Sequence, residues 1–124
     1  MSGFQSHLQA IVSALPGALV ATLMGTDGIP VDTFEAEALH SEEGLDVSSL
    51  MVEFSSMMSQ VHKTGEIFAV GPLQELVIKS ERLVTLLRPL NAEYFVAVAL
   101  KPGGSAGKGR YLLRVHGARL VAEM

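Results

Sequence analysis

The sequence has 124 residues, 48% of them hydrophobic, which suits one domain with a packed core. The formal charge of −4 and the nine scattered basic residues argue against a surface that grips a phosphate backbone, so no nucleic acid partner is expected. Cysteine is absent, which excludes disulfides, thiolate nucleophiles and sulfur metal ligands and fits a reducing compartment.

The sequence also lacks the signals of membrane insertion and export. No segment reaches the roughly 18 uninterrupted apolar residues of a membrane span. Gln5 and His7 stand where a signal peptide would carry a basic and then an apolar region. We therefore expect a cytoplasmic protein without a membrane span.

Near the N-terminus, apolar residues recur on one helical face. They are Phe4, Leu8, Ile11, Val12 and Leu15. Ser2 can cap this helix and Pro16-Gly17 ends it. The apolar run from Ala18 to Met24 then predicts a central strand buried on both faces.

Turn residues Thr26-Asp27-Gly28 lead into a second strand, which alternates from Ile29 to Thr33 and should pair antiparallel with the first. Pro30 lacks an amide donor, which favours an edge position. The acidic, aperiodic stretch from Ala36 to Gly44 is interpreted as a solvated loop.

Asp46 can cap a second helix that Gly65 would end. Its apolar residues lie within about 60° of Phe54 at 100° per residue and should face the sheet. They are Val47, Leu50, Met51, Phe54, Met57, Met58 and Val61.

Three further strands are predicted after this helix. The first is a broken region formed by Ile67–Val70, Gly71-Pro72 and Leu73–Ser80; the others are Leu83–Leu87 and Glu93–Leu100, with turns at Ser80-Glu81 and Asn91-Ala92. Successive strands joined by tight turns indicate an antiparallel meander.

Lys101 to Gly109 is rich in glycine and predicts a flexible loop, after which a third helix carries a repeated face. The residues of that face are Leu113, Gly117, Leu120, Val121 and Met124. The predicted fold class is α+β within residues 1–124 as a single domain. Its order is α-β-β-α-β-β-β-α, with a five-stranded antiparallel sheet and helices on both faces.

The glycine-rich run Gly103–Gly109 does not have the spacing of a phosphate-binding loop. Such a loop needs a glycine where Pro102 stands and a serine or threonine after Lys108, where the sequence has Gly109. A turn into the third helix is the better interpretation.

No other constellation indicates catalysis or a cofactor. His7, His40, His62 and His116 fall in separate elements without metal-ligand spacing, and His7 and His62 are expected to be solvated on helix flanks. No Gly-x-Ser-x-Gly elbow occurs, although a triad assembled across the fold stays open. We expect no metal, no cofactor, no small-molecule substrate and no independent enzymatic activity.

The second helix has an unusual outward face. It carries Ser48, Ser49, Val52, Ser56, Ser59, Gln60 and Lys63, with Glu53 and Ser55 at its flanks. A merely solvated helix would favour long charged side chains, whereas small ones let another backbone approach closely. This face is predicted to bind a partner; the alternative is an ordinary serine-rich surface.

The strand predicted over Leu73–Ser80 alternates in a way that suits a sheet edge. If it lies there, its free amides and carbonyls can pair with a second copy about a two-fold axis. The residues of this predicted dimer interface are Leu73, Glu75, Leu76, Val77, Ile78 and Lys79. An internal strand with ordinary neighbours is the alternative.

Residues 4 to 124 resemble the roadblock/dynein light chain family, and three segments carry the resemblance. Leu15-Pro16-Gly17-Ala18 through Thr26-Asp27-Gly28-Ile29 is similar to the family's opening hairpin. Asp46-Val47-Ser48-Ser49-Leu50 is similar to the start of its second helix, which is rich in small residues in bacterial members. Tyr94–Leu100, followed by Gly107, Arg110 and Leu113, is similar to its last strand and the Gly-x-x-Arg entry into the final helix.

The resemblance implies a homodimer joined through the third strand, with the two second helices side by side on a face where a Ras-like small GTPase docks. The expected docking residues are Ser49, Val52, Ser56, Ser59 and Lys63. The family includes a bacterial regulator of a polarity and gliding-motility GTPase, which repositions the catalytic residues of the GTPase itself. That regulator continues past its third helix, whereas this sequence ends at Met124, so a scaffold or motor light-chain role is the alternative function. A heterodimer with a second roadblock-like chain is the alternative assembly.

Overall fold

The computed structural model describes residues 3–124, so the predicted cap at Ser2 lies outside the described residues. It contains three α-helices, one short 3-10 helix and five strands. In chain order they are α1 (Gly3–Ala14), β1 (Ala18–Gly25), β2 (Pro30–Glu35), η1 (Glu37–Ser41), α2 (Val47–Ile67), β3 (Leu76–Lys79), β4 (Val84–Pro89), β5 (Tyr94–Leu100) and α3 (Ala106–Ala122). The predicted fold class is confirmed.

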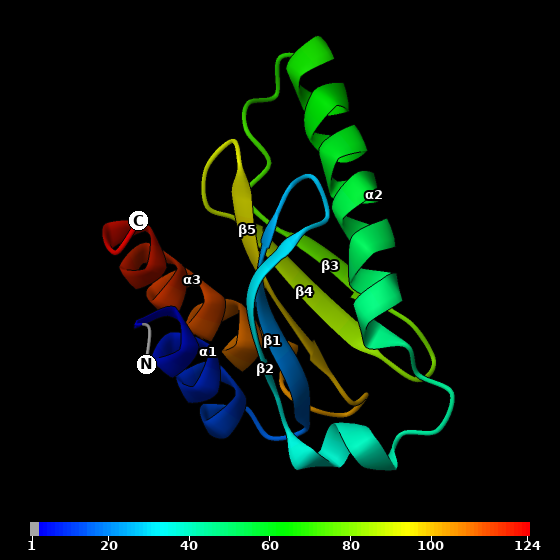
Figure 1. The fold of residues 1–124 in the computed structure, drawn as a ribbon. Helices are drawn as coiled ribbons and strands as arrows, with labels where there is room; N and C mark the ends of the chain where they lie inside the picture. The colour runs from blue at the N-terminus through cyan, green and yellow to red at the C-terminus, as the bar shows by residue number, and fades with distance from the viewer. Residues whose placement is uncertain (1–2) are drawn as a thin grey trace.

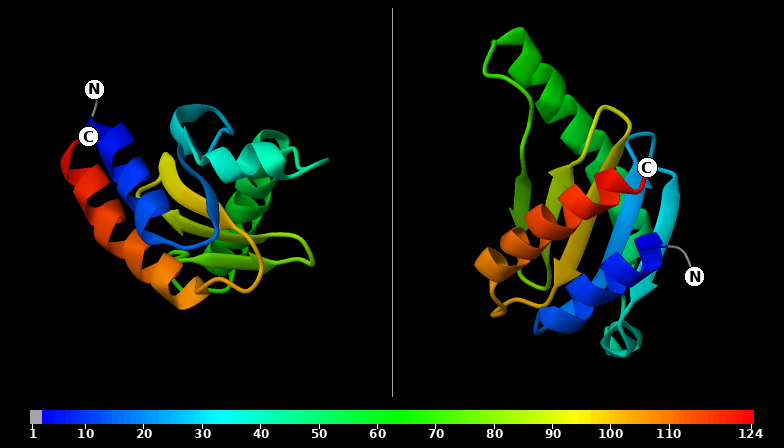
Figure 2. Two further views of the ribbon diagram at one scale, coloured as in Figure 1. Left: turned by 90° about the horizontal axis from the view of Figure 1, so that it is seen from below. Right: turned by 90° about the vertical axis from the view of Figure 1, so that its left-hand side faces the viewer.

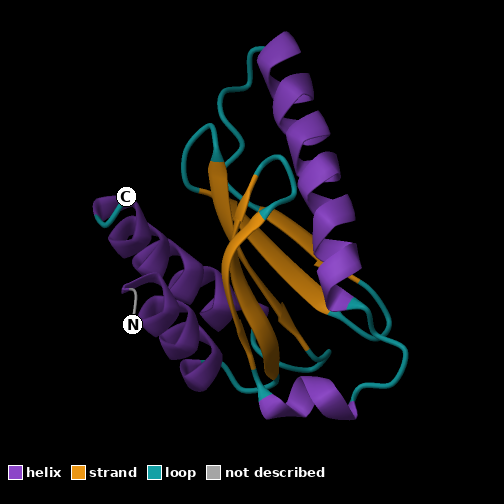
Figure 3. Ribbon diagram, viewed as in Figure 1, coloured by secondary structure: helices purple, strands orange, loops and turns teal. Residues whose placement is uncertain are grey.

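The five strands form one antiparallel sheet in the order β2-β1-β5-β4-β3, so β2 and β3 are its two edges. The predicted meander β3-β4-β5 is present, and β5 returns to pair with β1. Figure 3 shows the sheet as the middle layer of the molecule. Helices α1 and α3 lie side by side against one face and α2 covers the other (Figures 1 and 2).

The sheet divides the core into two halves. Between the sheet and α1 and α3 lie Leu8, Ile11, Leu86, Val98, Leu113 and Leu120, among others. Between the sheet and α2 lie Leu19, Met51, Phe54, Met58, Leu87 and Phe95. Every residue of β1 is buried, because core side chains cover both of its faces. Within residues 3–124, no helix has both the length and the apolar character needed to cross a bilayer.

Local side-chain chemistry sets several element ends as predicted. The Asp46 carboxylate accepts a hydrogen bond from the Ser49 amide at 3.1 Å and another from the Ser49 hydroxyl at 2.7 Å, which caps α2. In the β4–β5 turn, the Asn91 side chain accepts from the amides of Glu93 and Tyr94, each at 2.9 Å.

The boundary between α2 and β3 differs from the prediction. Helix α2 continues through Gly65 to Ile67, so Ile67–Val70 is a helix end and not a strand. The Ala69 amide bonds to Glu66 O and the Val70 amide to Gly65 O, with Ala69 at a φ of 58°. This pairing is a Schellman motif, which satisfies the last carbonyls of a helix. Only Leu76–Lys79 is left as the third strand.

Two predicted loops are also partly helical. Glu37–Ser41 forms η1 inside the acidic stretch 36–44. Helix α3 begins at Ala106, inside the run predicted as a flexible loop, because the Ser105 side chain accepts from the Lys108 amide and caps it. Val121 and Met124, predicted on the packed face of the last helix, are exposed.

Two glycines on the buried face of α3 let this helix lie close to the sheet. A Cβ at Gly109 would stand 2.5 Å from Leu86 Cδ1 and 3.2 Å from Leu15 Cδ2. A Cβ at Gly117 would stand 3.0 Å from Leu90 Cδ2. By contrast, Gly107 is exposed on the same helix, and its nearest side-chain atom would be 4.0 Å from a Cβ.

Alanine substitutions at Gly109 and Gly107 should therefore have opposite effects. Gly109→Ala should lower the free energy of unfolding by about 1–3 kcal/mol, because overpacking forces the sheet and helix apart. Gly107→Ala should raise it by roughly 0.5–1 kcal/mol, because alanine favours the helix. Urea denaturation measures both, and equal effects at the two positions would contradict the close packing.

Candidate interaction surface

The two edges of the sheet differ, because the backbone groups of the β2 edge are capped. Pro30 offers no amide donor there, the Asp32 carboxylate accepts from the Thr33 amide at 2.9 Å, and the Gln5 side chain of α1 donates to Thr33 O. The β1–β2 register also shifts between Leu23 and Met24. Such features stop an edge strand from pairing with another chain.

The β3 edge lacks such capping. Ser80 donates to Leu83 O in the following turn, and backbone groups alternate in an antiparallel ladder, so Val77 and Lys79 direct their amides and carbonyls outward. Among residues 3–124, no side chain hydrogen-bonds to the backbone of Leu76–Lys79. The β3 edge is therefore free to pair.

Helix α2 turns a different face to the sheet from the one predicted. Its buried residues are Val47, Met51, Phe54, Ser55 and Met58. Met57 and Val61, predicted to face the sheet, are 51% and 42% exposed, and Leu50 is half-buried. Ser55, predicted at the flank, is buried and donates its hydroxyl to Val52 O at 2.6 Å. At 100° per residue, the buried face is rotated by roughly 50° from the prediction.

The rotation leaves an apolar stripe on the β3 side of α2. Val47, Met51 and Val52 line a pocket with residues of β1 and β2, so the opposite flank of the helix is turned toward β3. That flank carries Leu50, Met57 and Val61, and the half-buried Leu76 and Ile78 of β3 pack on the same side of the sheet. We call these five residues the apolar seam.

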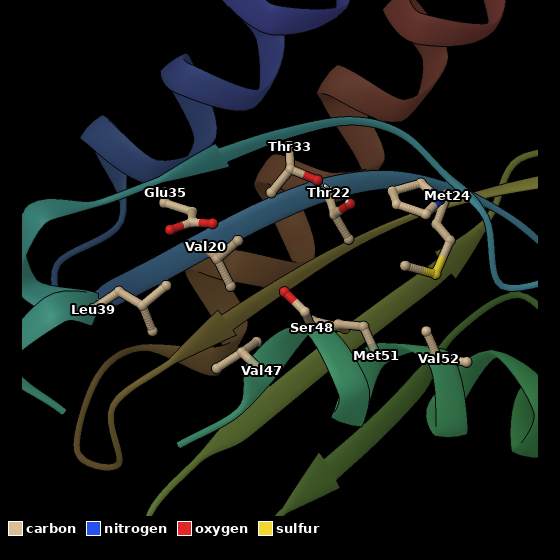
Figure 4. Close-up of a pocket in the computed structure, with 11 residues that line it drawn as sticks. Val20, Thr22, Met24, Thr33, Glu35, Leu39, Val47, Ser48, Met51 and Val52 are labelled. Atoms are coloured by element: carbon tan, nitrogen blue, oxygen red, sulfur yellow. Dashed lines mark hydrogen bonds between the residues drawn. The ribbon is translucent and has the colours of Figure 1, made fainter. Parts of the chain in front are cut away.

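On its other flank, α2 borders a pocket of about 120 Å³ against the β1–β2 hairpin (Figure 4). Val52 and Ser48 stand at its helical wall, and Thr22 and Thr33 opposite share a hydrogen bond of 2.9 Å between their hydroxyls. Val52 also packs near Gly28 in the hairpin turn. Val52 is therefore part of a shallow apolar hollow and does not stand alone on the helix surface.

The end of α2 exposes further apolar side chains that the sequence analysis did not identify. The helix extends past the end of the sheet before the chain returns to β3 (Figure 1). Ile67, Phe68 and Val70 at this end are 77%, 73% and 78% exposed. The sequence pattern predicts a broken strand over Ile67–Val70, and this prediction gave no indication of the exposed helix end.

Comparisons with known proteins place the fold. The crystal structure of MglC from Myxococcus xanthus matches this fold with a TM-score of 0.70. The two sequences are 35% identical, and the match covers 99% of this chain and 100% of MglC. A Roadblock/LC7 domain from Streptomyces avermitilis is 14% identical, with 93% and 92% of the two chains covered and a TM-score of 0.77. The gliding protein MglB from Thermus thermophilus is 16% identical over 98% of this chain and 90% of MglB, with a TM-score of 0.80. A scan against protein-family models and a search of curated proteins found no match.

Full-length identity of 35% to MglC, together with the shared fold, decides the family. The chain belongs to the roadblock/LC7 family. In this roadblock/LC7 chain the five predicted docking residues lie along α2. Ser49, Val52, Ser56 and Lys63 are exposed, Ser59 is half-buried, and Ser49 also serves the helix cap.

The residues predicted for the roadblock/LC7 dimer interface divide into two groups. Leu76, Val77, Ile78 and Lys79 form β3, whereas Leu73 and Glu75 precede it. The Leu73 amide donates to His62 Nδ1 at 3.3 Å, and the Glu75 carboxylate forms an ion pair with Arg110 of α3. The predicted strand was longer than the observed one because these two residues are held by side chains from the helices.

Two histidines predicted to be solvated have partners. His62 accepts the Leu73 amide and pairs with Glu66 at 2.8 Å. His7 lies against His116 of α3. Within residues 3–124, no three histidine or carboxylate side chains converge as metal ligands.

Proposed function

We propose that the chain is a non-catalytic, homodimeric regulator that binds a Ras-like small GTPase and modulates its nucleotide state. The observation that supports it best is the open β3 edge beside the apolar seam. A free edge and an exposed apolar stripe on one side of a molecule together favour association with a second copy.

The dimer is proposed to form by antiparallel pairing of β3 with β3 about a two-fold axis. Val77 and Lys79 would exchange backbone hydrogen bonds and extend the sheet across both copies. A strand of four residues is too short to provide the roughly 1,200–2,000 Å² of a stable interface. The apolar seam would supply the missing apolar area, because it extends from β3 to α2 and would bring Met57 and Val61 of the two α2 helices side by side.

In such a dimer, the outward faces of the two α2 helices form one continuous platform, where we place the GTPase. Ser56 and Ser59 present small side chains that allow close approach, and Lys63 offers a single cation. The hollow beside Val52 has room for an apolar side chain of the partner. The five docking residues include no arginine, so the regulator is proposed to bias the conformation of its partner's own catalytic groups rather than to supply an arginine finger.

The proposed dimer can be tested by a substitution that places a charge in the apolar seam. Met57→Glu should raise the dimer dissociation constant at least tenfold while leaving the fold intact, because Met57 is exposed in the monomer but covered in the dimer. Gln60→Glu adds the same charge on an exposed position of the same helix and should leave the dimer unchanged. Analytical ultracentrifugation gives both constants. A Met57→Glu chain that dimerises like the wild type would contradict the proposed interface.

The proposed binding of a GTPase can be tested by a substitution that places a charge on the platform. Ser56→Glu should weaken binding to a Ras-like GTPase of the same organism at least tenfold without changing the dimer, and Ser13→Glu on the exposed side of α1 should have no effect. GTP hydrolysis is measured with and without the chain. Binding without a change in rate would leave the scaffold function, and the absence of binding to any Ras-like GTPase would refute both.

A further inference from the structure

Two histidines from the two ends of the chain meet between α1 and α3. His7 Nδ1 and His116 Nδ1 are 3.2 Å apart, and their ring centroids are 5.4 Å apart. His116 is only 8% exposed and the His7 side chain 16%. On the other side of the His7 ring, Nε2 lies 3.3 Å from a carboxylate oxygen of Glu123, the residue after α3.

The contact depends on the protonation of both rings. A hydrogen bond between the two Nδ1 atoms needs one N–H donor and one bare nitrogen. With both rings neutral, His116 Nδ1–H can donate to His7 Nδ1 while His7 Nε2–H donates to Glu123. With one ring charged, the other still offers a bare Nδ1. With both rings charged, two N–H groups and two positive charges face each other, and neither nitrogen can accept.

We propose that the His7–His116 contact is a proton-sensitive clasp that joins the first and last helices at neutral pH and releases the end of α3 when both imidazoles are protonated. The released segment would be the last turn of α3 with Glu123 and Met124. Met124 lines an apolar pocket with Phe4, Tyr94 and two other side chains, so release would uncover apolar surface at this corner of the fold.

The surroundings of His116 disfavour its charged form. Burial lowers the pKa of His116 from its ordinary value of 6.5, and the neighbouring His7 and Arg119 lower it further. On the sheet side, Arg88 of β4 packs near Gly117, the next residue of α3, and adds no negative charge. Glu123 is the acidic group at the pair, and it contacts the His7 ring.

The sign of the pH effect follows from this lowered pKa. The unfolded chain takes up a proton on His116 near pH 6.5, whereas the folded chain keeps this ring neutral to lower pH. The folded state therefore keeps its full stability above that value and loses stability as the pH falls below it. One proton changes the unfolding equilibrium constant by up to tenfold per pH unit.

The test compares full-length wild type, His116→Gln and His40→Gln between pH 7.5 and 5.5. His40 is an imidazole on η1, far from the pair in the chain, and serves as the matched control. In urea denaturation, the unfolding equilibrium constant of the wild type and of His40→Gln should change by up to tenfold per pH unit. This pH dependence should be absent in His116→Gln. Hydrogen exchange, corrected for its intrinsic pH dependence, should show faster opening of amides 119–123 at pH 5.5 in those two chains only.

The clasp is refuted if His116→Gln keeps the wild-type pH dependence of both stability and exchange. If His116→Gln does not fold, His7→Gln replaces it, since His7 lies at the edge of the contact. This variant removes the second positive charge and should abolish the acid-induced opening of amides 119–123. Opening that persists in His7→Gln would equally refute the clasp.

Discussion

The open edge of β3 is the constraint on which the account of this protein depends. A backbone donor or acceptor at a sheet edge must be satisfied by water, by a capping side chain or by another strand. At β2, Pro30, Asp32 and Gln5 exclude another strand. At β3 the described chain has no equivalent, and the apolar seam joins side chains of this strand to the neighbouring flank of α2. Because one edge is capped and the other is not, the strand pairing that we propose would use a single side of the sheet.

Helix α2 connects the edge to the proposed function. Its buried arc from Val47 to Met58 fixes the helix to the sheet. One flank contributes the helical part of the seam, and the other borders the hollow at Val52. Each flank can therefore serve a different contact in the proposed assembly, in which the seam would meet a second copy and the outward face with the hollow would meet the GTPase. Changes at Met57 and Ser56, one residue apart, should separate the two contacts.

Most of the fold could be predicted from sequence because strong local signals agreed with the tertiary structure. The run Ala18–Met24, the cap at Asp46 and the edge position of Pro30 each follow from the chemistry of one short segment. The errors arose where distant packing decided. Gly65 does not end α2, because the left-handed residue of the Schellman motif is Ala69, four residues later. The rotation of α2 about its own axis depends on which of its many apolar residues meet the sheet. Helical periodicity alone cannot decide which of two adjacent faces of the helix is buried. The contact between His7 and His116 joins residues 109 positions apart and leaves no local pattern.

Amide hydrogen exchange at Val77 and Lys79 is the most direct test of the proposed dimer. In an isolated chain these amides point to solvent and should exchange freely, like those of other exposed edge positions. If β3 pairs with β3, both should be strongly protected at protein concentrations above the dimer dissociation constant and lose that protection on dilution, while the amides of β1 stay protected throughout. Free exchange of Val77 and Lys79 at every concentration would contradict the account.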